Sequence, residues 1–258
     1  MGVKSIGAIR DVALAVLLLI VTGFAWLSVI RSATMMPMEM KPLSVAAMAE
    51  FTIEWGVMMT AMMLPSAAPM ILLYSRASQG RGKFRERVMP AEAFASTYVA
   101  LWLLTGVPVY LARVGIGELA ARSIAFRVAM PYAIAATLFA AGVYQLTPAK
   151  HACLRQCQSP ADFLMRRWRS GYLASLRLAV IHAAYCIGCC WALMVLLVVA
   201  GAMSLPWVLV IALLVFAEKV LPGGKHTARI AGVALIAAAL MVAIWPELAG
   251  ALRPNGHR

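Results

Sequence analysis

Three cysteines and a histidine stand close together in an uncharged stretch of the sequence. Cys186 lies four residues after His182, and Cys190 lies four residues after Cys186. In a helix this spacing places the side chains on one stripe, with Cys189 on nearly the same face. Nitrogen and sulfur donors suit Cu(I), with Zn(II) as the second choice, better than Mg²⁺ or Ca²⁺. The alternative is a hydrogen-bonded core histidine beside small buried thiols.

A second set of candidate metal ligands precedes a pair of prolines. The four-residue spacing places these side chains on one helical stripe or on the row beside it: Glu50, Glu54, Met58, Met62, Met59 and Met63. Two carboxylates one turn apart in an apolar segment repel each other, so we expect a proton or a cation to neutralise at least one. Pro65 and Pro69 predict a broken helix immediately afterwards. The alternative is a packing face of methionines below glutamates that reach water.

Two weaker sets could serve as accessory metal sites. One is a run of thioethers, which remain soft ligands in an oxidising compartment, and it comprises Met35, Met36, Met38 and Met40. The other is Cys153 and Cys157, which would share one face of a helix. Each set also has an interpretation without metal. The methionines would be interface packing residues, and the cysteines would be ordinary reduced thiols in the cytoplasm.

Glu218 and Lys219 close an apolar segment near its predicted cytoplasmic end. Adjacent helical residues point apart. We therefore expect Lys219 to extend to the membrane edge as an anchor, and Glu218 to be a charge that faces inward.

The elements that carry these residues are predicted to be membrane-spanning helices. The chain has 258 residues, of which 63% are hydrophobic and 13% charged, whereas soluble domains have about a quarter charged residues. This excludes an ordinary soluble enzyme and a disordered chain. Runs of about 20 apolar residues predict seven spans in one integral membrane domain, 1–258. The predicted spans are 12–30, 46–74, 92–112, 128–147, 178–203, 205–221 and 230–246, an all-α polytopic transmembrane helix bundle.

The basic residues predict the orientation of these spans. The formal net charge is +13, and 16 of the 23 Lys and Arg residues fall on one side if the N-terminus is cytoplasmic. Cytoplasmic loops carry such an excess. The seven spans then leave the C-terminus outside. The positive charge therefore reflects topology, and we expect no nucleic-acid partner.

The two candidate ligand sets are expected at similar depths in the membrane. At 1.5 Å per residue, Met62 and Met63 lie roughly 23 Å from the outer edge, and Cys189 and Cys190 roughly 20 Å. If these antiparallel spans are neighbours, the methionines face the thiols.

Several of these segments together resemble a bacterial family of predicted metal-binding integral membrane proteins. The similar segments are 54–69, the pattern Lys150-x-x-Cys153-Leu154-x-x-Cys157, 186–194 and 217–219. The similarity extends from about residue 50 to about residue 222. It implies a polytopic protein of the bacterial inner membrane that binds metal. The sequence departs from the family pattern at 183–185, where we expect a glycine close after His182.

These observations predict a copper(I) site between the second and fifth spans, which serves copper handling, transport or delivery. The lipid bilayer, a metallochaperone or a membrane complex would be its partners. Two alternatives remain: a membrane thiol redox protein, and a non-catalytic subunit of a larger membrane complex. We identify no catalytic residue and no motif for an organic cofactor, so the sequence leaves open whether the protein is an enzyme.

Overall fold

Helices are the only regular secondary structure in the described part of the chain. The computed structural model describes residues 2–35, 43–78, 90–169, 171–199 and 205–251, which form eleven α-helices and no strand. The all-α prediction is therefore confirmed. The helices are α1 (Gly2–Met35), α2 (Val45–Ser78), α3 (Ala91–Leu104), α4 (Gly106–Arg122), α5 (Ile124–Leu146), α6 (Pro148–Gln158), α7 (Pro160–Arg167), α8 (Tyr172–Val199), α9 (Leu205–Val220), α10 (Gly224–Ile244) and α11 (Leu248–Ala251).

Six described segments are long and apolar enough to cross a membrane. They are α1, α2, α3 together with α4, α5, α8 and α10. The count is one lower than expected because the predicted segment 205–221 forms α9, which has only 16 residues. Such a helix is about 24 Å long, which is shorter than the hydrocarbon core of about 30 Å.

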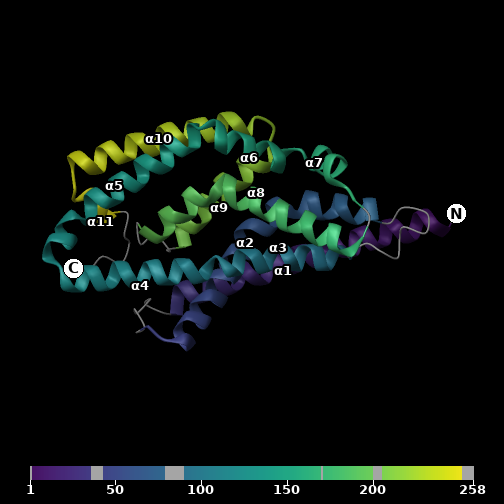
Figure 1. Cartoon of the computed structure of the whole chain (residues 1–258), viewed down its shortest axis with the longest axis horizontal. Helices are drawn as coiled ribbons and strands as arrows, with labels where there is room; N and C mark the ends of the chain where they lie inside the picture. Colours follow the sequence, from purple (N-terminus) through teal and green to yellow (C-terminus); the bar gives the residue numbers. More distant parts are fainter. Residues whose placement is uncertain (1, 36–42, 79–89, 170, 200–204, 252–258) are drawn as a thin grey trace.

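The helices form two groups with α8 and α9 between them (Figure 1). Along one edge α5 and α10 lie side by side, and α1 to α4 lie along the other edge. Gly142 and Gly232 let α5 and α10 approach closely, since a Cβ atom on Gly232 would lie 2.9 Å from the Gly142 carbonyl oxygen. Small residues of this kind are common where apolar helices pack backbone to backbone.

A buried ion pair joins α6 to α9. Lys150 Nζ lies 2.6 Å from Glu218 Oε2, and the exposed fractions of the two side chains are 0% and 1%. Gln145 Nε2 donates to Glu218 Oε1 at 3.0 Å, and Lys150 Nζ donates to Gln145 Oε1. The prediction that Glu218 faces inward is thus confirmed. Gly223, with φ of +88°, makes the turn that ends α9 directly after this cluster.

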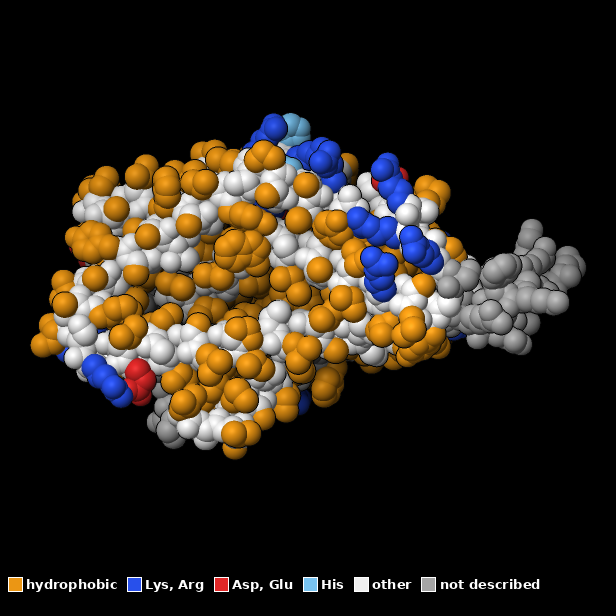
Figure 2. Space-filling model, in the orientation of Figure 1, with side chains coloured by type: hydrophobic (Ala, Val, Ile, Leu, Met, Phe, Trp, Pro, Cys, Tyr) orange, Lys and Arg blue, Asp and Glu red, His pale blue; other side chains and the backbone are white. Residues whose placement is uncertain are grey.

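The visible surface is mainly apolar. Figure 2 shows hydrophobic side chains over most of this face, while Lys and Arg side chains gather near α6 and α7. Large exposed hydrophobic residues occur along α1, α5 and α10, for example Leu19 at 71%, Val128 at 68% and Ile230 at 71%. A single chain in water would expose these residues at a cost of about 25 cal/mol per Å², so this surface suits a lipid environment.

Candidate metal centre

The methionines of α2 are buried in the centre of the molecule. Met59 and Met63 are 0% exposed, Met62 is 1% and Met58 is 6%. The helix continues through Pro65 and ends only at Ser78, so the predicted break after Met63 is wrong. Each proline removes one backbone hydrogen bond, but α2 packs against α1, α3 and α9 and has buried residues both before and after the prolines.

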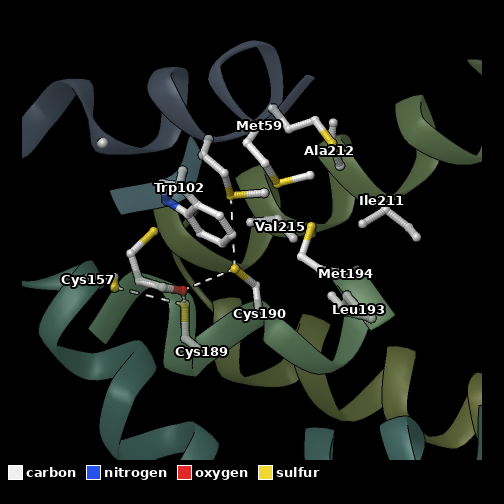
Figure 3. Close-up of a cluster of buried hydrophobic side chains, with 14 of the residues drawn as sticks. Met59, Trp102, Cys157, Cys189, Cys190, Leu193, Met194, Ile211, Ala212 and Val215 are labelled. Carbon is white, nitrogen blue, oxygen red and sulfur yellow. Dashed lines mark hydrogen bonds between the residues drawn. The ribbon is translucent and has the colours of Figure 1, made fainter. Parts of the chain in front are cut away.

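The cysteines of α8 are buried: Cys186 and Cys190 contact residues of α3 and α2, whereas Cys189 contacts α6. Cys186 is 2% exposed, and Cys189 and Cys190 are each 1% exposed. Cys189 Sγ and Cys190 Sγ both donate to the Cys186 carbonyl oxygen, at 3.1 and 3.0 Å. These bonds orient the two thiols on one turn of α8, as Figure 3 shows.

A methionine of α2 and a cysteine of α8 meet in the space between the two helices. Cys190 Sγ lies 3.9 Å from Met63 Sδ. Helices α3 and α9 each contact both α2 and α8, so the sulfur atoms lie at the meeting point of four helices. The juxtaposition of the second and fifth predicted spans is therefore present in the structure. We call Met63, Cys186 and Cys190 the sulfur cluster.

A lysine enters the sulfur cluster from α9. Lys219 Nζ donates to Cys186 Sγ at 2.8 Å and lies 3.7 Å from Met63 Sδ and 3.9 Å from Cys190 Sγ. Its exposed fraction is only 5%. The prediction that Lys219 extends to the membrane edge is wrong, because Glu218 takes the opposite direction into its ion pair and turns Lys219 toward the sulfur atoms.

A tyrosine from α3 completes the surroundings of Cys186. The Tyr98 hydroxyl group and the Cys186 thiol group share a hydrogen bond of 2.8 Å, and Tyr98 is 1% exposed. The hydroxyl oxygen also lies 3.4 Å from the Met63 carbonyl oxygen. Cys186 therefore has one hydrogen-bonding neighbour from α3 and one from α9, which fixes the position of its sulfur atom.

A second group of thiols lies between α6 and α8. Cys157 Sγ is 3.9 Å from Cys189 Sγ, a contact that Figure 3 marks with a dashed line. Cys153 packs against Gly188, where a Cβ atom would lie 3.2 Å from its sulfur. Hydrogen bonds with Cys186 and Cys189, together with burial, raise the pKa of the Cys157 thiol well above its ordinary value. Burial also raises the pKa of Cys153. Both thiols of α6 therefore favour the protonated form.

His182 is buried one turn before Cys186 and has no hydrogen-bond partner for either ring nitrogen within the described residues. It is 3% exposed. Aromatic rings surround it, with centroid distances of 5.5 Å to Phe163, 5.7 Å to Tyr98 and 6.2 Å to Phe94. An unpaired buried imidazole is costly. His182 is thus a polar group beside the cluster with unused ligand capacity.

The two predicted glutamate ligands lie apart from the cluster. Glu50 and Glu54 are exposed on α2, and Glu54 interacts electrostatically with Arg113 of α4. The structure describes no side chain for Met35, and the other predicted outer-loop ligands, Met36, Met38 and Met40, lie outside the described residues. In the part that is described, no group of three or more His, Cys, Asp and Glu side chains is arranged to hold a metal ion. The candidate centre therefore depends on a methionine thioether as well as on cysteines.

The structure adds Tyr98 and Lys219 to the residues found from the sequence. Lys219 carried a signal, because a lysine next to a predicted inward-facing glutamate is unusual in an apolar segment. Tyr98 carried none, since a tyrosine in an apolar helix is common in a core or at a membrane interface.

Together, the helices and the buried sulfur cluster define an all-α protein with a soft-ligand centre enclosed between its helices. Residues 52–242 match the protein family described as PpoB2, copper chaperone. The chain belongs to this family. Comparisons with curated proteins and with solved structures gave no match.

Proposed function

We propose that this protein is an integral membrane protein that binds Cu(I) in the sulfur cluster and serves copper transport or delivery. The observation that carries the proposal is the 3.9 Å separation of Cys190 Sγ and Met63 Sδ in a fully buried centre that also contains Cys186. Two sulfur ligands of one metal ion, each at about 2.3 Å, lie roughly 4 Å apart. The membership of a copper chaperone family supports the same cargo.

The donor set favours Cu(I) over Zn(II). Soft thiolate and thioether ligands suit Cu(I), and two or three of them are sufficient. A structural zinc site has four ligands drawn mainly from Cys and His. The described residues contain no group of three such side chains in a metal-binding arrangement. Copper is therefore the proposed cargo, with zinc as the competing ion.

We further propose that the six long helices cross the bacterial inner membrane with the N-terminus in the cytoplasm. The shorter α9 returns the chain from the outer end of α8 to the cytoplasmic start of α10, which leaves the C-terminus outside. The excess of basic residues in the predicted cytoplasmic loops supports this orientation. On this topology the thiols Cys153 and Cys157 of α6 lie toward the cytoplasm, between that compartment and the sulfur cluster. On this topology the sequence predicts that the methionine run 35–40 faces the outer side, where it would collect copper.

Elemental analysis of the detergent-purified protein tests the proposed cargo. The protein is expressed with and without added copper and compared with a Cys186→Ser/Cys190→Ser variant. A Cys153→Ser variant is the matched control, because it removes a thiol outside the sulfur cluster. We expect near-stoichiometric copper in the wild type and in the control, and its loss in the double variant. Equal copper content in all three proteins would contradict the proposal.

A thiol redox function is the second candidate, and the proximity of Cys157 and Cys189 favours it. Their sulfur atoms lie 3.9 Å apart, within reach of disulfide formation after a small movement. In that case Met63 would be dispensable and alkylation of the thiols would abolish function. A Met63→Leu variant distinguishes the two candidate functions. It should impair function if the protein binds copper in the sulfur cluster, and it should leave function intact if the protein works by dithiol chemistry.

A further inference from the structure

Lys219 is the feature of the sulfur cluster that copper binding alone does not explain. A lysine with 5% exposure is rare in an apolar core. Within the described residues, no carboxylate forms an ion pair with it, since the adjacent Glu218 is paired with Lys150. Its ammonium group instead lies within 4 Å of three sulfur atoms, with distances of 2.8, 3.7 and 3.9 Å.

Charge counting indicates what this arrangement does for a bound metal ion. Metal-bound cysteines are thiolates, whereas a methionine thioether is neutral. Cu(I) bound by Cys186, Cys190 and Met63 therefore has a net charge of −1. The ammonium group of Lys219 brings the total to zero. Zn(II) with the same ligands is neutral by itself, so the same ammonium group leaves a total of +1.

Burial makes this difference in net charge between the Cu(I) and Zn(II) complexes energetically important. A net charge in a low-dielectric interior is unfavourable, while a neutral assembly avoids most of that cost. The sulfur cluster is enclosed by four helices, and its three sulfur residues are at most 2% exposed. No solvent layer is available to screen the extra charge of a divalent ion.

We propose that Lys219 is a specificity-determining residue that favours the monovalent cuprous ion over divalent ions by neutralising the copper bis-thiolate. This inference rests on the proposed copper site. Lys219 acts through its fixed charge and its position beside Cys186, not as a metal ligand. The position is held from outside the site, because the Glu218–Lys150 ion pair and the Gly223 turn anchor the end of α9.

The test compares the affinities of the detergent-purified protein for Cu(I) and Zn(II), each measured by competition with a chromophoric chelator under anaerobic conditions. Lys219→Leu removes the charge without adding a donor atom, and Lys219→Gln is a second neutral variant. Lys219→Arg keeps the charge. Lys225→Met is the matched control, since Lys225 is exposed on α10 and its loss removes the same charge from outside the cluster.

We expect the preference for Cu(I) over Zn(II) to fall at least about tenfold in both neutral variants, with Zn(II) bound more tightly than by the wild type. Lys219→Arg and Lys225→Met should retain the wild-type preference. An equal loss of affinity for both ions in the neutral variants would overturn the inference, because it would indicate a ligand or a purely structural lysine. Failure of the wild type to bind Cu(I) would instead refute the copper site itself.

Discussion

The buried ion pair between Lys150 and Glu218 gives the clearest quantitative prediction about stability. The atoms lie 2.6 Å apart and the side chains are 0% and 1% exposed. At an effective dielectric constant of about 20, their attraction is about 6 kcal/mol, which is offset by desolvation of both groups. Lys150→Met leaves the Glu218 carboxylate buried without its cation, and we expect a loss of about 3–5 kcal/mol in the free energy of unfolding.

The double variant Lys150→Met/Glu218→Gln removes both charges. In the wild type, Gln145 bonds to both Glu218 and Lys150. The glutamine introduced at position 218 can still bond to Gln145, so Gln145 keeps one of its two partners. We therefore expect the double variant to be more stable than Lys150→Met alone by about 2 kcal/mol. Because the protein contains seven Trp residues, tryptophan fluorescence can follow its unfolding in mixed micelles.

The exposed ion pair between Arg122 and Glu118 is the control for this experiment. Its atoms are 2.9 Å apart, but the side chains are 80% and 59% exposed. Arg122→Met should change stability by no more than about 0.5 kcal/mol. The reasoning is refuted if the double variant is no more stable than Lys150→Met, or if Arg122→Met is as destabilising as Lys150→Met.

Three further predictions concern helix packing, the sulfur cluster and the thiols of α6. Gly232→Val should destabilise the protein by about 1–3 kcal/mol, because a Cβ atom at position 232 would lie 2.9 Å from the Gly142 carbonyl oxygen. Gly115→Ala is the control and should not destabilise the protein, since a Cβ atom there meets open space. Equal melting temperatures of the two variants would contradict this prediction. Tyr98→Phe should weaken Cu(I) binding about fivefold in chelator competition, through loss of about 1 kcal/mol of hydrogen bonding to Cys186; unchanged affinity would exclude that role. Burial raises the pKa of the Cys153 thiol, so its alkylation, followed by mass spectrometry, should reach half of its maximal rate at a higher pH than alkylation of free cysteine. A midpoint at or below that of free cysteine would contradict the raised pKa.

The helices and the facing sulfur groups were predictable because both depend on local patterns. Apolar runs gave the helical segments, and the rise of about 1.5 Å per residue placed Met63 at the depth of Cys190. The structure brings these two residues to 3.9 Å. What the sequence could not provide was the helix arrangement, in which α3 and α9 contact both α2 and α8. Tyr98 and Lys219 enter the site only through that arrangement.

The exposed position of Glu50 and Glu54 has a geometrical cause. Residues four apart in a helix are rotated by about 40° from each other, since each residue turns by about 100°. Three such steps, from Glu50 to Met62, therefore turn the side chain by about 120°. The stripe that appears straight in the sequence winds around α2, and only its second half reaches the buried centre.

X-ray absorption spectroscopy at the copper edge of the copper-loaded protein tests the central claim most directly. We predict a Cu(I) edge and a first shell of sulfur scatterers only, with one sulfur fewer in Met63→Leu. A first shell dominated by oxygen or nitrogen would contradict the account, because it would assign the ion to Glu50 and Glu54, or to the His182 imidazole, instead of the sulfur cluster.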